Sequence, residues 1–142
     1  MNKASVICIG VKNMEESFNF YKKLGFSTKE EWNNQPVVFF DTVGTKLELY
    51  PLDLLAKDID ETNPPKITTG FSGITLAHNV ASEKEVDEVI ELARKNGATI
   101  AKEPKKVFWG GYSGYFVDPN GYYWEVAYNP GWKFDETGLI VF

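Results

Sequence analysis

A short segment occurs twice in this sequence, and each copy carries one glutamate among apolar residues. The first copy spans 44–51 and contains Glu48, and the second spans 121–130 and contains Glu125. In both copies a turn glycine precedes a strand pattern, and further upstream each half has a strand pattern followed by an amphipathic helix. A duplicated module places equivalent strands at related positions. We therefore expect both carboxylates to reach one concave surface that acts as a binding site.

The composition is typical of one compact domain. The chain has 142 residues, of which 43% are hydrophobic and 25% are charged. The net charge of −5 argues against a nucleic-acid partner, which would require a basic surface. Apolar runs are too short to span a membrane, the N-terminus has no signal-peptide pattern, and the single cysteine, Cys8, excludes an internal disulfide. We predict a cytoplasmic protein that binds neither nucleic acid nor membranes.

The first half of the chain predicts a βαβββ module with a short helix after it, over residues 1–59. Asn13 is a helix N-cap, with Glu16 at the third position of a capping box, and Gly25 ends this helix. The expected strands lie at 4–11, 26–32, 37–43 and 46–50, and the short helix at 51–59.

The second half predicts another βαβββ module, over residues 73–128, after an acidic, proline-containing linker at 60–72. Ser82 caps its helix and Gly97 ends it. We expect strands at 73–78, 98–101, 108–109, 112–117 and 122–128, a hairpin turn at 118–121, and an irregular tail at 129–142. The predicted fold class is α+β, with two βαβββ modules that form a curved mixed sheet around a cavity.

The alternation of side chains along a strand predicts which residues face this cavity. In the last strand Trp124 and Val126 should pack on the helix, which leaves Glu125 on the cavity side. His78 falls on the helix side, so we interpret it as structural. Three glycines among four aromatic residues at 108–115 indicate either a wall for a planar ligand or a packed hairpin. The candidate ligand-binding residues are Glu48, Thr75, Trp109, Tyr112, Tyr123 and Glu125.

Residues 11–26 and 118–126 resemble the vicinal oxygen chelate superfamily, which includes glyoxalases, bleomycin-resistance proteins, extradiol dioxygenases and fosfomycin-resistance enzymes. In its metal-dependent members, the first and last strands of each module hold a divalent ion. The matching positions here are Val6, Glu48, Gly73 and Glu125, and the valine and glycine have no donor atom. Glu48 and Glu125 are thus the only candidate metal ligands. No cofactor is expected, although binding of a Mg²⁺ or Mn²⁺ ion that keeps several of its waters is an open alternative.

The leading interpretation is a metal-independent protein that binds a drug-like or aromatic small molecule, as the drug-sequestering members do. The alternative is an enzyme with Glu48 and Glu125 as its catalytic residues, namely a metal-dependent lyase or isomerase of the glyoxalase type. An extradiol dioxygenase fits less well, because its iron requires two histidines and a carboxylate. An interaction module with a vestigial cavity is a third reading.

Each glutamate also has a simpler interpretation, in which it is solvated or is neutralised by Lys46 or by a backbone donor. If both carboxylates share a partly dry cavity, repulsion and burial should raise at least one pKa. Exposed module edges and abundant aromatic residues favour a homodimer.

Overall fold

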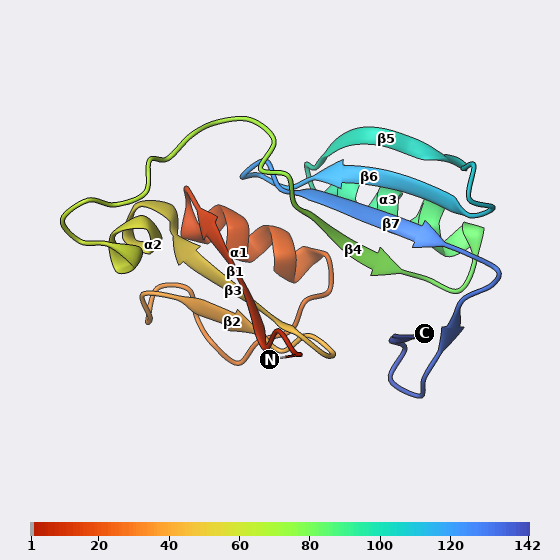
Figure 1. Ribbon diagram of the computed structural model, residues 1–142, viewed down its shortest axis with the longest axis horizontal. Helices are drawn as coiled ribbons and strands as arrows, with labels where there is room; N and C mark the ends of the chain where they lie inside the picture. The colour runs from red at the N-terminus through yellow and green to blue at the C-terminus, as the bar shows by residue number, and fades with distance from the viewer. Residues whose placement is uncertain (1) are drawn as a thin grey trace. The chain divides into compact units, whose positions relative to one another are not determined.

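The computed structural model describes residues 2–142, and the chain divides into two compact units. Unit 1 is Met1–Gly70 and unit 2 is Phe71–Phe142. Each unit combines a mixed β-sheet with helices (Figure 1). The predicted α+β class with mixed sheets is thereby confirmed.

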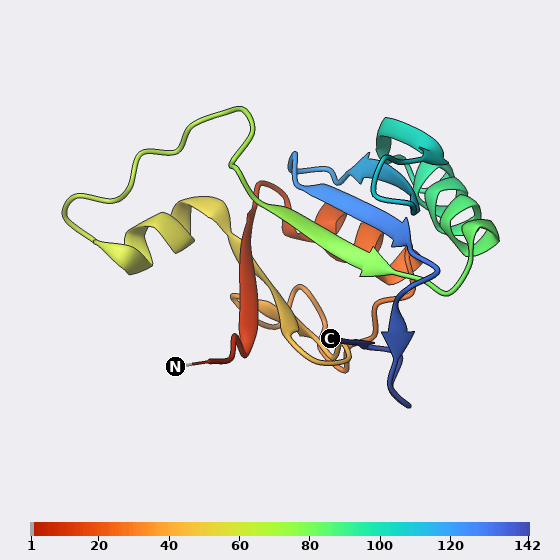
Figure 2. The same ribbon diagram turned by 45° about the vertical axis from the view of Figure 1, so that its right-hand side comes forward.

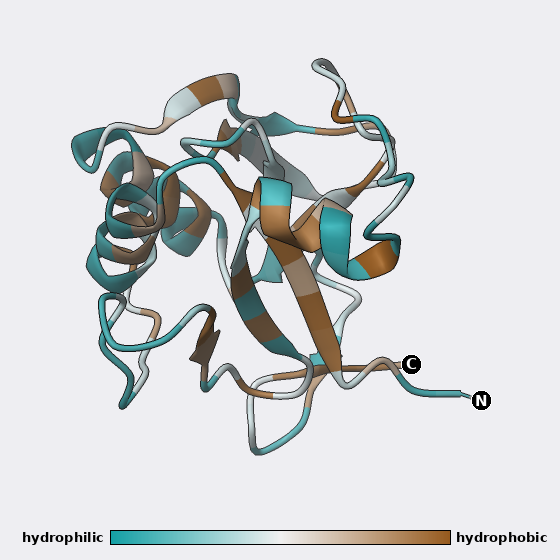
Figure 3. Ribbon diagram, turned by 90° about the vertical axis from the view of Figure 1, so that its left-hand side faces the viewer, coloured by the Kyte–Doolittle hydropathy of each residue, from teal (hydrophilic) through white to brown (hydrophobic). Residues whose placement is uncertain are grey.

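Unit 1 has a three-stranded sheet in the order β1-β3-β2, in which β1 is parallel and β2 antiparallel to β3. Along β3, hydrophilic and hydrophobic residues alternate, which is visible as bands in Figure 3. This alternation gives the sheet one apolar face, on which α1 packs. The elements of unit 1 are β1 (Val6–Val11), α1 (Met14–Lys23), β2 (Val38–Phe40), β3 (Lys46–Pro51) and α2 (Leu52–Ile59).

The core of unit 1 is a cluster of aromatic rings between α1 and the sheet. Tyr21 and Phe40 are fully buried, with ring centroids 5.9 Å apart, and Phe18 stacks on Phe40 at 6.0 Å. Burial of each large apolar side chain contributes roughly 1.5–3 kcal/mol. This cluster holds α1 on the face of the sheet that carries Leu47 and Leu49.

The strand predicted at 26–32 is not formed, and the next one is shortened to β2. Phe26 packs from a loop against Tyr21, with the ring centroids 5.2 Å apart. The backbone N–H of Phe39 donates a hydrogen bond to the carboxylate of Glu30 at 2.6 Å. A side chain therefore satisfies the outer edge of β2 where a fourth strand would have paired.

Unit 2 contains the predicted order of one strand, one helix and three strands. Its sheet has the order β4-β7-β6-β5, with β4 parallel to β7 and the other pairs antiparallel. Helix α3 lies along one face of β5, β6 and β7 (Figure 2). The elements are β4 (Thr75–Asn79), α3 (Glu83–Lys95), β5 (Thr99–Lys106), β6 (Tyr112–Val117) and β7 (Tyr123–Tyr128).

Apolar residues of α3 and of the sheet form the core of unit 2. Val86 and Ile90 of α3 are buried, as is Val126 of β7. A Cβ atom at Gly114 of β6 would lie 3.2 Å from Ile90 Cγ1, so this glycine allows the helix to approach the sheet closely. The face of the sheet towards α3 is therefore the packed one.

Three predictions for the second half are wrong. Residues 108–109 lie in the turn between β5 and β6, and β5 extends to Lys106, beyond the predicted end at residue 101. The tail is a small hairpin of β8 (Lys133–Phe134) and β9 (Ile140–Val141), and not an irregular segment. The carboxylate of Asp135 accepts hydrogen bonds from the backbone of Thr137 and Leu139, which organises the turn between these strands.

The predicted helix boundaries are confirmed by the capping contacts. Asn13 accepts a hydrogen bond from the N–H of Glu16 at 2.9 Å, and Ser82 accepts one from the N–H of Glu85 at 3.2 Å. Gly25, after α1, has φ of 100° in the left-handed region that favours glycine. Within residues 2–142, every helix is too short or too polar to cross a membrane.

Candidate functional site

Glu48 and Glu125 occupy equivalent positions in their own sheets. Each lies on an interior strand, β3 or β7, between a parallel neighbour and an antiparallel neighbour. The residues directly opposite are Cys8 and Phe39 for Glu48, and Ala77 and Tyr115 for Glu125. The duplication seen in the sequence is therefore also present in the strand register. That the two carboxylates share one cavity stays a prediction.

In unit 1, Glu48 lies on the face of the sheet opposite the aromatic core. Leu47 and Leu49 on either side of it are buried, whereas Glu48 is half-buried. A Cβ atom on Gly10 would lie 2.5 Å from Leu52 Cδ1 and 3.3 Å from Leu52 Cα. The absence of a side chain at Gly10 therefore lets the start of α2 approach this face.

The face around Glu48 has a negative electrostatic character. Burial, a hydrogen bond to Glu48 and the charges of Glu48 and Asp58 raise the pKa of the Cys8 thiol to about 12. Burial and the charges of Asp58 and Glu48 also raise the pKa of Tyr50. At neutral pH the thiol is therefore protonated, so Cys8 is not an activated nucleophile. This face suits a cationic or hydrogen-bond-donating group.

In unit 2, Glu125 lies on the face of the sheet opposite α3, as predicted from the alternation. Trp124 and Val126 on either side of it are buried. Thr75 and Tyr123 are direct partners in the register of β4 and β7, and Tyr123 lies two residues from Glu125 on the same face. The structure thus brings Thr75, Tyr123 and Glu125 to one face of one sheet.

Three polar residues that the sequence did not indicate lie beside Glu125. Lys102, Tyr115 and Glu125 are successive cross-strand partners on β5, β6 and β7. The ammonium group of Lys102 donates to Ser113 Oγ at 2.8 Å and lies 5.5 Å from the centroid of the Tyr115 ring. Burial, the charge of Glu125 and a hydrogen bond to Glu125 raise the pKa of Tyr115. We call Lys102, Ser113, Tyr115 and Glu125 the polar row.

The bulges of β5 explain why sequence reasoning missed Lys102. The register between β5 and β6 shifts between Ile100 and Lys102, and again between Lys102 and Lys105. Each shift breaks the alternation from which a facing side chain would be inferred. Ser113 and Tyr115 lie on a regular strand, and their alternation with Gly114 was the available signal.

The two other predicted ligand-binding residues of unit 2 lie elsewhere. The hydroxyl of Tyr112 donates to Asp87 of α3 at 2.9 Å, so this side chain is on the α3 face. Trp109 lies in the turn before β6 and stacks on Trp132 of the tail, with the ring centroids 5.9 Å apart. A Cβ atom at Gly111 would lie 1.7 Å from Trp109 Cζ3. The glycine–aromatic segment therefore contacts the tail through Trp109, while Phe108 in the same turn is fully exposed.

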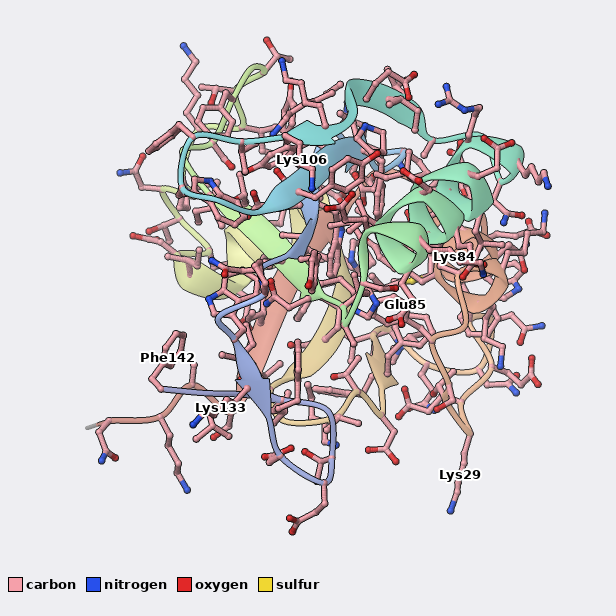
Figure 4. The ribbon with its side chains drawn as sticks, turned by 90° about the vertical axis from the view of Figure 1, so that its right-hand side faces the viewer. Lys29, Lys84, Glu85, Lys106, Lys133 and Phe142 are labelled. Atoms are coloured by element: carbon pink, nitrogen blue, oxygen red, sulfur yellow. The ribbon has the colours of Figure 1, made fainter. Side chains whose placement is uncertain are left out.

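His78 lies on β4 opposite Val126, on the α3 side of the sheet. Although part of the side chain is exposed, burial lowers the pKa of His78, while the charge of Glu85 acts in the opposite direction. Glu85 extends from the first turn of α3, next to Lys84 (Figure 4). The position of His78 away from the Glu125 face agrees with its interpretation as structural.

The residues present do not fit the metal site that the resemblance implies. Val6 has no donor atom, and Gly73 precedes β4 with φ of 81°, a left-handed conformation that side chains rarely adopt. Within residues 2–142 no group of three or more His, Cys, Asp or Glu side chains is placed to hold a metal ion. Glu48 and Glu125 remain the two carboxylates at matching positions.

Comparisons with known proteins agree with this description. The family model of the Glyoxalase/Bleomycin resistance protein/Dioxygenase superfamily matches residues 3–126. Among solved structures, a glyoxalase-related enzyme from Fulvimarina pelagi is similar with 28% identity, coverage of 100% of this chain and 99% of that chain, and a TM-score of 0.88.

More distant structures share the fold. One is a glyoxalase/bleomycin resistance protein/dioxygenase family enzyme from Burkholderia phytofirmans, with 20% identity, coverage of 89% and 98% of the two chains, and a TM-score of 0.77. Another is a lactoylglutathione lyase from Agrobacterium tumefaciens, with 20% identity, coverage of 94% and 98%, and a TM-score of 0.68. Among curated proteins none matches the sequence. The chain belongs to the Glyoxalase/Bleomycin resistance protein/Dioxygenase superfamily.

Proposed function

We propose that this protein binds a small organic molecule without a catalytic metal ion, and that Glu48 and Glu125 contact this molecule. Both carboxylates lie on the sheet faces opposite those on which α1 and α3 pack, and both have a neutral group beside them, Cys8 or Tyr115. A carboxylate held in this way recognises a cation or a hydrogen-bond donor on a ligand. Thr75 and Tyr123 extend the surface around Glu125.

The observation that carries the proposal is the backbone of Gly73. The position that supplies a metal ligand in relatives is here in a left-handed conformation outside the strand. Histidine is absent from this position, and its backbone would be strained in this conformation. With Val6 in the other first strand, the two carboxylates would have to bind a metal without a nitrogen donor, which favours only a weak Mg²⁺ or Mn²⁺ site.

A second candidate function is a lyase or isomerase of the glyoxalase type. It is favoured by the similarity to the glyoxalase-related enzyme, which extends over the whole chain. Such an enzyme would use Glu48 and Glu125 with a hydrated metal ion, or one of them alone as a general base. In the second version, Tyr115 would be the acid that accompanies Glu125.

Elemental analysis and thermal unfolding separate the metal-independent protein from the metal-dependent enzyme. Protein purified without chelator is analysed for metals and is unfolded with and without Mg²⁺, Mn²⁺, Ni²⁺ and Zn²⁺. The variants are Glu48→Gln and Glu125→Gln, with Glu61→Gln in the exposed linker as the matched control. We expect no stoichiometric metal and no metal-dependent stabilisation. A bound metal whose stabilisation is lost in both site variants, and kept in the control, would overturn the proposal in favour of the enzyme.

We further propose that the protein is a cytoplasmic homodimer. The supporting observation is that β1 and β4 are edge strands of their sheets, and that Ile7 and Ile74 on or next to them are exposed. Edge strands with exposed apolar residues favour association. Light scattering of the purified protein over a range of concentrations tests the oligomeric state, and a monomer throughout that range would refute the homodimer.

A further inference from the structure

We infer that Lys102, Ser113 and Tyr115 form a position for the carboxylate group of a small-molecule ligand, on the face of unit 2 that carries Glu125. The inference rests on the proposed function for the existence of such a ligand, and it names the chemistry of one end of it. The four members of the polar row cross the sheet from β5 to β7. They therefore offer a ligand a cationic end and an anionic end.

The first argument is that Lys102 has no acidic partner. Within residues 2–142, no carboxylate lies within ion-pair distance of its ammonium group, whose contacts are the Ser113 hydroxyl and the Tyr115 ring. The side chain is half-buried. A partly desolvated ammonium group without a counter-charge is unfavourable, and a ligand anion would supply that charge.

Lys106 on the same strand shows the contrast. Its ammonium group forms an ion pair with Glu83 of α3. Lys106 is labelled in Figure 4. Lys106 therefore has a structural partner on the α3 side, whereas Lys102 lies on the Glu125 side and has none. The difference between these two lysines is what indicates a ligand at Lys102.

The second argument is that Lys102 is held in place. Ser113 is fully buried, and its hydroxyl accepts the hydrogen bond from Lys102 at 2.8 Å. The face of the Tyr115 ring attracts the same ammonium group. An ammonium has three donors, so the bond to Ser113 leaves others for a ligand. Pre-positioning lowers the entropic cost of binding an anion.

The third argument concerns the order of charges along the row. Tyr115 lies between Lys102 and Glu125 in the register, and its ring centroid is 5.5 Å from the Lys102 ammonium group. The two charges are two strands apart, or roughly 10 Å at the usual spacing of strands. A ligand with a carboxylate over Lys102 and a donor or cation over Glu125 would complement both ends.

Two probes with a common ring test this inference, namely benzoate and benzylamine. Binding to the full chain is measured by calorimetry at millimolar concentrations. We expect benzoate to bind, and its affinity to fall about tenfold in Lys102→Gln, as is typical for loss of a charge-assisted hydrogen bond. Benzylamine should respond to Glu125→Gln and not to Lys102→Gln.

Lys106→Gln is the matched control, because it removes the same charge from the same strand on the other face. It should leave the affinity for benzoate unchanged. The inference would be overturned if the protein did not bind benzoate at all, or if Lys102→Gln left the benzoate affinity unchanged. It would also be overturned if Lys102→Gln and Lys106→Gln lowered this affinity equally. In each of these cases, benzylamine binding that depends on Glu125 would leave the proposed function intact, and only the carboxylate position at Lys102 would be refuted. A purely structural Lys102 would instead lower the midpoint of thermal unfolding without changing the affinity for benzoate.

Discussion

Tyr115 and Glu125 are direct partners across β6 and β7, and burial, the charge of Glu125 and a hydrogen bond to it raise the pKa of the Tyr115 hydroxyl. In unit 1 the group whose pKa is raised beside Glu48 is the Cys8 thiol, which lies on β1, the parallel neighbour. The two halves of the chain thus place a neutral group beside the carboxylate from different strands, β6 in unit 2 and β1 in unit 1. Each half-buried carboxylate keeps one neutral donor, which satisfies it without cancelling its charge.

Replacement of Tyr115 by phenylalanine should destabilise the protein modestly. The ring and its contact with Lys102 remain, and only the hydrogen bond to Glu125 is lost. We expect a loss of about 0.5–1 kcal/mol in the free energy of unfolding, measured with urea. Tyr123→Phe removes a hydroxyl from the same face and should have no measurable effect. Equal losses in both variants would contradict the assigned hydrogen bond.

The thiol of Cys8 should react slowly with iodoacetamide at pH 8. Its pKa of about 12 lies above that of a free cysteine, because burial and Glu48 disfavour the thiolate. Alkylation followed by mass spectrometry should therefore speed up with pH until well beyond pH 9. Glu48→Gln removes the charge and should accelerate the reaction at pH 8. A native protein that reacts as fast as unfolded protein would refute the raised pKa.

The same pKa predicts how stability depends on pH. The folded-state pKa of Cys8 is raised, so above the unfolded-state value near 9 the unfolded chain loses this proton first. The unfolded state then binds fewer protons, and the free energy of unfolding falls as pH rises from about 9 towards 12. The free energy of unfolding of Cys8→Ala should fall less steeply over this pH range. Parallel pH profiles for the two proteins would show that Cys8 does not contribute.

Gly111→Ala should displace Trp109 from the tail. The new Cβ atom would lie 1.7 Å from Trp109 Cζ3 and 2.5 Å from the backbone oxygen of Tyr128, so the turn must shift. We expect a loss of about 1–3 kcal/mol and a change in tryptophan fluorescence, as the stack on Trp132 opens. Gly131→Ala, with its nearest contact at 3.3 Å, is the control and should change neither.

Asp118→Ala should weaken the turn that aligns β6 with β7. Its buried carboxylate accepts hydrogen bonds from the N–H groups of Asn120 and Tyr122, at 2.9 and 2.8 Å. Removal deletes the acceptor of both hydrogen bonds and should cost about 1–3 kcal/mol of unfolding free energy. Asp118→Asn retains one acceptor oxygen and should lose less of the free energy of unfolding. The opposite ranking of the two variants would show that the carboxylate does not organise the turn.

Local features of the sequence determined the helices and the main faces of the sheets. Asn13 and Ser82 cap their own helices, and a cap acts over one turn of chain. The alternation in β7 correctly put Trp124 and Val126 on the core side and Glu125 on the other, because a regular strand has a period of two residues.

Tertiary structure alone decided which polar groups meet on the Glu125 face. Lys102 reaches Ser113 and Tyr115 only because bulges shift the register of β5, and a register is set by pairing between distant residues. The loop at 26–32 illustrates the same limit, since its strand-like residues form no ladder and Phe26 packs on Tyr21 instead. Long-range packing and pairing energies, which no local pattern contains, assembled the polar row.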